Sequence, residues 1–429
     1  DLRTVTDSVV AFPGEMAKAA RTGDPVRAMV RGRISYVDPQ EVEFELPSHG
    51  DMFNVNSNLV PGVSGIKGGR LLMGSKYFTQ ALPVREAEAP LVQGLDPNSA
   101  EGKSYEEQLV PHLGAVASDS ALGPGLVTSV GADHVEVKHG KEKRRYELYN
   151  NFPFNRKTYI HNTPVVKLGD QVKPGQLLAK SNYSDDQGRL AMGRNLKVAY
   201  TIWGDPELGG SNFEDGVVMS ETAARKMSSE HMYTVGYDGK DDYQASYSKF
   251  VSLFPGQYSK DQLKNLDFES GVVKPGTVLN PGDPIILGVG ERKSDTFGLM
   301  KKSRPSYTNR AQTWEHSQPG VVTDVTKTRS GYQVAIKSYK PMGVGDKLVG
   351  RYGDKGVIST IIPDDDMPKD KDGNPFEVIY NPLALTSRVN PVQAVEAAMG
   401  KIASKTGQPV KLPAFLDESY IDFAQRELK

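Results

Sequence analysis

Residues 344–359 read Val344-Gly-Asp-Lys-Leu-Val-Gly-Arg-Tyr-Gly-Asp-Lys-Gly-Val-Ile-Ser359. The basic residues Lys347, Arg351 and Lys355 recur every four positions, and four glycines stand among them. The glycines argue against a helix and predict a tight loop whose backbone can approach a ligand closely. Spaced Lys and Arg side chains suit phosphate groups. The GxxxxGK[ST] spacing of a Walker A loop is missing, and a solvated basic turn fits the same spacing equally well.

Two other short segments combine charge with a turn or a helix start. Ser211-Asn-Phe-Glu-Asp-Gly216 places Glu214 beside Asp215, and adjacent acids can bind a divalent cation or orient a basic partner. More often, such acids in a turn are only solvated. Asn381-Pro-Leu-Ala-Leu-Thr-Ser-Arg-Val-Asn390 places Arg388 just before a predicted helix, where backbone N–H groups favour anions. The alternative is that Arg388 simply pairs with a nearby carboxylate.

The length and composition of the chain exclude several classes of protein. The 429 residues suffice for two or three domains, and 52 Lys and Arg against 53 Asp and Glu give a net charge of −1. This balance excludes a generally basic nucleic-acid coat, although a local basic groove is compatible with it. Cysteine is absent, so no disulfide and no thiolate metal site is expected, and no zinc. No apolar run approaches the roughly 18 residues that span a bilayer. The 43 glycines and 28 prolines indicate many turns and short strands.

Local patterns predict a β-rich α+β chain. Residues 126–137 and 321–336 alternate apolar and polar side chains around a turn, which is typical of hairpins. Residues 33–46 favour a strand–turn–strand, and Lys-Pro-Gly at 173–175 and at 274–276 predicts type II turns. The charged run 141–145 is interpreted as a solvated hairpin tip. Residues 230–315 are polar and interpreted as an insertion with little core before Gly271.

Helices are expected at three places. One lies near residues 15–20, and a second starts near Asp417. The clearest begins with Asn390 as the cap and Pro391 in the first turn, and it stops at Gly407.

The three charged segments together resemble the second half of the β subunit of the multisubunit, cellular-type RNA polymerases. Residues 345–359 are similar to that family's GDKMAGRHGNKGVIS, residues 212–215 to its GYNFED, and residues 381–390 to its NPLGVPSRMN. Three further similarities follow in family order: residues 70–90 resemble NRALMGANMQRQAVP followed by EAP, residues 190–195 resemble LALGQN, and residues 363–368 resemble P-x-EDMP. The resemblance covers roughly residues 33–425 without a break in order.

The resemblance implies a double-psi β-barrel with an inserted flap-like domain. The expected parts are an N-terminal extension (1–32), the first barrel part with a hybrid-binding region (33–229), the flap-like insertion (230–315), the second barrel part with the basic loop (316–390), and a C-terminal helical segment (391–429). In the family this barrel faces a second one in the β′ subunit, and the active site lies between them.

Roles carry over residue by residue. Lys347 and Lys355 would contact phosphates at the RNA 3′ end, and Arg70 and Arg388 would hold the triphosphate of the incoming nucleotide. These four are the expected catalytic residues. Arg351 joins them in the expected NTP- and RNA-binding set.

Three more residues have implied roles around this centre. Gln80 would touch the RNA–DNA hybrid, while Glu214 and Asp215 would lie near the second metal without binding it directly. The cofactor is Mg²⁺, held mainly by a β′-like partner that carries the DxDGD motif. The chemistry would be two-metal nucleotidyl transfer, and the chain alone would be inactive.

The sequence departs from the family pattern at several positions. Tyr352 replaces a His, Asp354 an Asn, Ser211 a Tyr and Lys76 an Asn. The added acid at Asp354 is expected to weaken the positive field around Lys355. None of these positions carries an assigned role, and together they mark a divergent member.

The ends suggest a β subunit divided over several chains. The family's N-terminal β lobes and its C-terminal GGQRFGEME anchor are not in this sequence, and the first residue is Asp1. Divided β subunits are typical of giant bacteriophages, so the expected locations are the cytoplasm of an infected bacterium, the virion, or both. Expected partners are the β′-like chain, separate chains for the lobes and the anchor, DNA, RNA and NTPs, with a sigma-like factor as a further candidate and no membrane.

A second reading belongs to another class of protein. The chain could be a virion structural or binding protein that keeps the barrel without catalysis. The basic residues at all four expected catalytic positions argue against it, because a scaffold has no need of them. A generic nucleotide- or sugar-binding β protein would explain the turns but not the order of the motifs.

Overall fold

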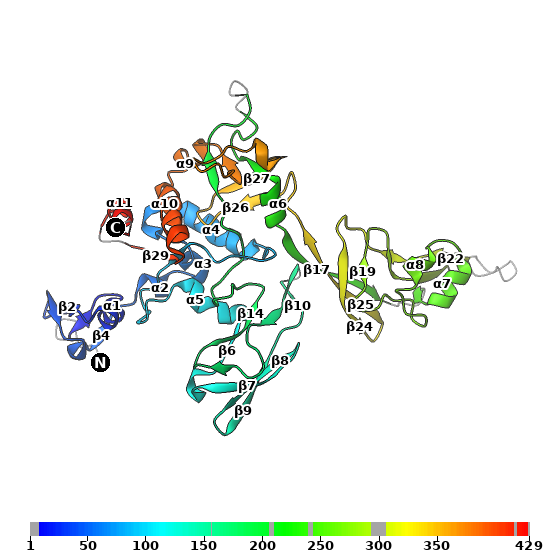
Figure 1. Cartoon of the computed structure of the whole chain (residues 1–429), viewed down its shortest axis with the longest axis horizontal. Helices are drawn as coiled ribbons and strands as arrows, with labels where there is room; N and C mark the ends of the chain where they lie inside the picture. The colour runs from blue at the N-terminus through cyan, green and yellow to red at the C-terminus, as the bar shows by residue number, and fades with distance from the viewer. Residues whose placement is uncertain are drawn as a thin grey trace, which may run out of the picture. The chain divides into compact units, whose positions relative to one another are not determined.

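The computed structural model describes residues 8–155, 157–205, 210–238, 243–292, 306–415 and 418–427. The chain divides into two compact units. The larger comprises residues 1–148, 162–227 and 342–429, and the smaller comprises residues 149–161 and 228–341. Short strands outnumber helices in the described ranges, which confirms the strand-rich α+β class (Figure 1). Within these ranges, no helix combines the length and the apolar character needed to span a membrane.

One sheet of the larger unit lies near the N-terminus. It has the order β3 (Arg33–Val37), β2 (Val26–Val30), β1 (Val10–Ala11), β4 (Phe44–Glu45). Strands were expected at β3 and β4, but these two do not pair with each other. Instead β3 pairs with β2 across a turn in which Arg31 and Gly32 have φ of 47° and 76°. Two successive left-handed residues make the tight turn that suits strand twist, so the hairpin forms one strand earlier than predicted.

A second sheet of the larger unit has the order β13 (Gln171–Val172), β7 (Gly125–Val130), β8 (His134–His139), β9 (Glu142–Glu147). The pairing of β7 with β8 confirms the first predicted hairpin. The interpretation of residues 141–145 as a tip is wrong for most of the run. The turn is made at Gly140, with φ of 58°, and the following charged residues form the exposed edge strand β9. Charged side chains on an edge strand discourage pairing with other chains.

The central sheet of the larger unit joins segments that are far apart in sequence. Its order is β15 (Val198–Tyr200), β28 (Val378–Tyr380), β16 (Gly216–Ser220), β27 (Lys355–Ile362), β26 (Lys347–Val349). The pairing is mixed, because β16 runs parallel to β27 and antiparallel to β28. Val217, Met219 and Ile358 are fully buried in its core. The basic segment is therefore anchored on a packed sheet.

Three predicted helices are confirmed: α1 (Glu15–Thr22), α10 (Pro391–Thr406) and α11 (Tyr420–Glu427). Gly407 ends α10 in the left-handed region with φ of 71°. The expected side-chain cap at Asn390 is wrong, because its amide nitrogen donates to Gln393 Oε1 rather than the side chain accepting from the helix backbone. A further helix, α4 (Gly68–Gln80), carries Arg70 near its start.

The smaller unit has its own sheet and core. The sheet order is β17 (Ser229–Asp238), β25 (Gly331–Lys340), β24 (Gly320–Lys327), β19 (Val278–Leu279). The pairing of β24 with β25 confirms the second predicted hairpin. The expectation of little core before Gly271 is wrong, because Phe250 and Leu266 are buried with Trp314. Phe250 lies on the short helix α7 (Tyr247–Leu253), whose apolar positions were too few to stand out in the sequence.

Both predicted Lys-Pro-Gly turns are present. Gly175 and Gly276 have φ of 71° and 82°, as the third position of a type II turn requires. The closing hydrogen bonds run from the Gln176 N–H to the Lys173 carbonyl, 3.1 Å, and from the Thr277 N–H to the Lys274 carbonyl, 3.3 Å.

Candidate functional site

The basic segment forms a β-hairpin rather than an irregular loop. In the antiparallel pair β26–β27, Lys347 lies opposite Val357, and Val349 lies opposite Lys355. Leu348 between them is buried in the sheet core. Because side chains alternate along a strand, Lys347 and Lys355 lie on the same exposed face. Diagonal neighbours of this kind lie about 7–8 Å apart, so both ammonium groups can reach one polyanionic ligand.

The turn of this hairpin packs tightly against α4. A Cβ on Gly74 would lie 2.3 Å from the Arg351 carbonyl oxygen, and a Cβ on Gly353 would lie 2.4 Å from the Arg70 carbonyl oxygen. Gly353 also has a left-handed φ of 72°. Arg70 Nη1 donates to the Gly353 carbonyl oxygen over 3.1 Å. The turn therefore fixes where the Arg70 guanidinium lies.

Replacing Gly74 by alanine should separate α4 from the turn. The added methyl group has no room against the Arg351 carbonyl oxygen, so we expect a loss of about 1–3 kcal/mol in the free energy of unfolding. Denaturant unfolding of the purified chain measures it. Gly69→Ala is the matched control, since nothing lies within 4 Å of that position on the same helix. Equal unfolding midpoints for the two variants would contradict the close packing.

Asp215 and Arg388 meet at the edge of the central sheet. Arg388 Nη2 forms an ion pair with Asp215 Oδ1, and the Asp215 carbonyl oxygen accepts from the Val357 N–H over 2.9 Å. Burial, helped by the nearby charge of Arg70, lowers the pKa of Arg388 from its usual range. Arginine nevertheless stays protonated.

The backbone beside this ion pair is strained. Glu214, just before Asp215, has φ of 54°, and Val389, just after Arg388, has φ of 50°. Left-handed backbone is unfavourable for a β-branched residue such as Val389. Strain of this kind concentrates at functional sites, and here both partners of the ion pair are flanked by it.

The structure brings four residues predicted from sequence close together: Arg70, Asp215, Lys355 and Arg388. Arg70 forms a hydrogen bond with the hairpin turn just before Lys355. Arg388 pairs with Asp215, and the Asp215 backbone forms a hydrogen bond with β27. Lys347 joins them on the exposed face of the hairpin. Gln80 does not, because it ends α4, ten residues or about 15 Å beyond Arg70. Glu214 is exposed beside Asp215.

Arg351 is placed differently from the other basic residues. Its guanidinium pairs with Glu106 over 3.5 Å and with Glu396, and its side chain is only 15% exposed. Glu106 is 1% exposed, and its burial raises the pKa of this carboxyl group to about 7 despite the Arg351 charge. The role predicted for Arg351 in phosphate binding stays a prediction, and these ion pairs favour a structural role.

Sequence reasoning missed both acids that hold Arg351. A signal existed for Glu396, which lies four residues after Val392 and three before Met399, both fully buried on α10. A carboxylate on the apolar stripe of a helix indicates a buried cationic partner. No comparable signal marked Glu106, because its helix α5 (Tyr105–Leu109) is a single short turn.

Several segments of the resemblance hold the chain together rather than face a ligand. The Asn212 side chain is fully buried and binds the backbone of Thr201 and Trp203, at 2.8 and 3.0 Å. Asn195 accepts from the Leu91 N–H over 3.2 Å, and its backbone N–H donates to Glu88 over 3.1 Å. These contacts hold the segment that follows α4, at residues 88–91, against the segment that precedes β15, at Asn195.

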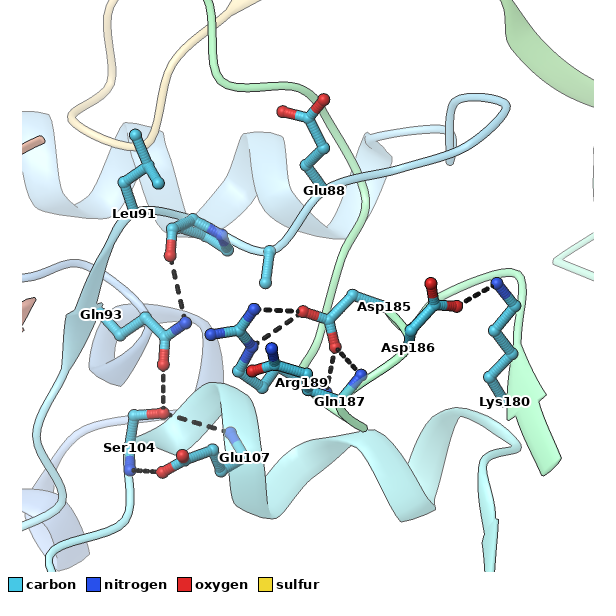
Figure 2. A network of polar contacts seen from close by, with 12 residues as sticks. Glu88, Leu91, Gln93, Ser104, Glu107, Lys180, Asp185, Asp186, Gln187 and Arg189 are labelled. Atoms are coloured by element: carbon cyan, nitrogen blue, oxygen red, sulfur yellow. Dashed lines mark hydrogen bonds and ion pairs between the residues drawn. The ribbon is translucent and has the colours of Figure 1, made fainter. Parts of the chain in front are cut away.

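A polar network surrounds the same segments (Figure 2). Asp185 accepts from the Gln187 N–H over 3.0 Å and from Arg189 Nε over 2.7 Å, while Lys180 pairs with Asp186. Ser104 Oγ donates to Gln93 Oε1 over 2.7 Å and caps α5. These contacts connect the residues around β5 (Val92–Gly94) and α5 to one another and brace the turn after β14 (Leu177–Ser181).

Metal ligands are sparse in the described part of the chain. No group of three or more His, Asp or Glu side chains there could hold a metal ion. Asp215 is engaged by Arg388, while Glu214 beside it is exposed. The indirect metal role expected for Glu214 and Asp215 stays a prediction.

A family model described as RNA polymerase Rpb2, domain 6, matches residues 121–429, well over half of the chain. The chain belongs to this family, and the predicted resemblance to the polymerase β subunit is confirmed at that level.

Full-length relatives are DNA-directed RNA polymerase β subunits. That of Deinococcus radiodurans is 29% identical over 444 residues, covering 94% of this chain and 35% of the relative. Those of Prochlorococcus marinus strain MIT 9215 and Kosmotoga olearia are 31% and 30% identical, covering 96% and 90% of this chain and 38% and 34% of the relatives. The chain thus spans about a third of the length of these proteins.

Proposed function

We propose that the chain is a functional part of a DNA-directed RNA polymerase, in which it binds phosphates of the RNA 3′ end and of the incoming NTP. One observation carries the proposal: Arg70, Lys355 and Arg388 are far apart in sequence, yet they gather at one edge of the central sheet. Lys347 extends the same basic surface. Phosphates are the ligands that such a set of cations fits best.

In this proposal the chain supplies charge and positioning, not the catalytic metal. The Lys347 and Lys355 ammonium groups would neutralise the charge that develops as the nucleotidyl group is transferred. The planar guanidinium groups of Arg70 and Arg388 would hold triphosphate oxygens. A β′-like partner with the DxDGD motif would hold Mg²⁺, so the isolated chain would be inactive.

In this proposal, Arg388 would exchange one partner for another when the nucleotide binds. In the chain alone it pairs with Asp215. A triphosphate offers more negative charge and more acceptor oxygens than one carboxylate, so it would draw the guanidinium away. Asp215 would then be released toward the second metal, which accounts for both predicted roles.

Finer features of the family are part of the same proposal. We infer that the mixed sheet from β15 to β26 belongs to a double-psi β-barrel, since it combines parallel and antiparallel pairs of strands from two distant segments. The smaller unit is the candidate for the flap-like domain, and it is wider than the predicted residues 230–315. A phage origin, a β subunit divided over several chains and packaging in a virion stay predictions.

Arg388→Ala should raise the KM for NTP in the assembled polymerase about 10- to 100-fold, because a charge-assisted hydrogen bond to the triphosphate is lost. Arg388→Lys should restore only part of the affinity, since a lysine cannot form the planar fork. Steady-state elongation on a fixed template measures both. An unchanged KM in Arg388→Ala would contradict the assignment of this residue to the triphosphate.

A further inference from the structure

The buried side of the turn between β26 and β27 is packed against the side chain of Asp354. This residue lies between Gly353, which touches α4, and Lys355, which starts β27. Asp354 is 7% exposed, and its carboxylate is packed over Gly350, where a Cβ would lie 2.4 Å from both carboxylate oxygens. The acid is therefore buried behind the turn, while Lys355 is exposed.

The start of α10 connects Asp354 to the central sheet. Gln393 Nε2 donates to Asp354 Oδ2 over 3.3 Å and to the Tyr200 hydroxyl over 3.2 Å. Gln393 Oε1 accepts from Asn390 Nδ2 over 3.2 Å. One glutamine thus links the turn, β15 and the residue that precedes α10.

This network is incomplete when Asp354 is ionised. Asp354 Oδ1 and Asn390 Oδ1 have no hydrogen-bond partner among the described residues, although both side chains are more than nine-tenths buried. Both atoms are acceptors, so neither can satisfy the other. A proton on Asp354 removes the buried charge, whereas ionisation leaves a charged carboxylate oxygen buried and unsatisfied, which is costly.

The surroundings also disfavour the ionised form. Burial, with a further contribution from the negative charge of Glu396, raises the pKa of Asp354 to about 6, although hydrogen bonds from the Asp354 and Tyr352 backbone and from Gln393 act in the opposite direction. The other titratable groups that face it are Tyr200 on β15, Tyr380 on β28 and Tyr352 in the turn itself. Because the pKa of Asp354 is raised in the folded state, its protonated form contributes to folding stability at low pH. This contribution is lost as the pH rises to about 6.

We propose that Asp354 is a positioning residue whose protonation state sets the hairpin turn and, through the turn, the placement of Arg70 and Lys355. The link to Arg70 is the hydrogen bond that Gly353 accepts from its guanidinium. The inference rests on the proposed function, and it adds a pH dependence to nucleotide binding. Ionised Asp354 leaves the turn poorly held and weakens NTP binding, while the neutral form holds it.

The test compares wild type with Asp354→Asn in the assembled polymerase. The asparagine keeps the shape of the side chain, cannot ionise, and offers both an acceptor and donors. The KM for NTP and kcat are measured from pH 5.5 to 8.5. We expect equal KM values near pH 5.5, and at pH 8 a wild-type KM about three- to tenfold above that of Asp354→Asn, the effect of one buried hydrogen bond. Because Lys355 directly follows Asp354, the wild-type kcat should also fall over this pH range, and that of Asp354→Asn should not.

Two further variants sharpen the test. Gln393→Ala removes the donor that stabilises the carboxylate, so the midpoint of the KM–pH curve should move to higher pH. Asp365→Asn makes the same chemical change at an exposed carboxylate and should leave the curve as in wild type.

The positioning role of Asp354 and the proposed function fail on different results. Parallel KM–pH curves for wild type and Asp354→Asn, or an altered melting temperature without a change in KM, would show that Asp354 has only a structural role and overturn this inference. No RNA synthesis by the wild-type complex at any pH would overturn the proposed function, and this inference with it.

Discussion

Lys347→Ala and Lys355→Ala should each slow RNA elongation by the assembled polymerase, by a factor on the order of 10–1000. Both side chains lie on the exposed face of the β26–β27 hairpin, so each variant removes one charge from the surface that would meet the phosphates. Neither lysine supports the fold through the buried side of the hairpin, where Leu348 lies. The loss should therefore appear in the rate of nucleotide addition and not in the melting temperature.

Single-nucleotide addition by rapid quench measures this rate on a preassembled RNA–DNA scaffold. Lys371→Ala, at another exposed lysine of the same unit, is the control and should elongate like wild type. Unchanged rates in both hairpin variants would remove this hairpin from the active centre.

Arg351→Met should be the most destabilising of the substitutions considered. It leaves the almost fully buried Glu106 without its cationic partner, and breaking a buried ion pair costs about 3–5 kcal/mol. The cost should depend on pH. Beside Arg351, Glu106 has a pKa of about 7, so at pH 5 it is already neutral and loses little. At pH 8 it is ionised in wild type, and the variant must either bury an unpaired charge or take up a proton. The free energy of unfolding should fall more at pH 8 than at pH 5.

Guanidinium unfolding of the purified chain at both pH values measures the effect. In the double variant Glu106→Gln/Arg351→Met, the buried charge is gone, and most of the difference between the two pH values should disappear. Equal destabilisation by Arg351→Met at pH 5 and pH 8 would mean that the pair with Glu106 contributes little.

The sequence predicted much of the local structure because its signals are local. Both hairpins, both Lys-Pro-Gly turns and the helix that Gly407 ends follow from alternation, turn chemistry and capping within a few residues. The hairpin formed by β2 and β3 was not predicted. Its turn is Arg31-Gly32, and an arginine with φ of 47° is an unusual turn residue.

The arrangement of the site needed the fold. Resemblance indicated Arg70, Lys355 and Arg388, but only the packing of α4 on the hairpin turn explains how residues so distant in sequence meet. The spacing of the basic residues did not predict where the Arg351 side chain lies. Arg351 shares the four-residue period of Lys347 and Lys355, yet it lies in the turn and not on the strands, so its side chain points to Glu106 and Glu396. Asp354 is likewise buried behind the turn, whereas Lys355, the next residue, is exposed.

We propose that this chain works inside an RNA polymerase. A native pull-down of the chain, with mass spectrometry of its partners and an RNA synthesis assay on denatured and promoter DNA, tests it most directly. We predict co-purification with a chain that carries DxDGD, and Mg²⁺-dependent RNA synthesis by the recovered complex. Recovery with capsid or tail proteins only, and no RNA synthesis, would contradict the account and mean that the fold has been kept without the catalytic roles.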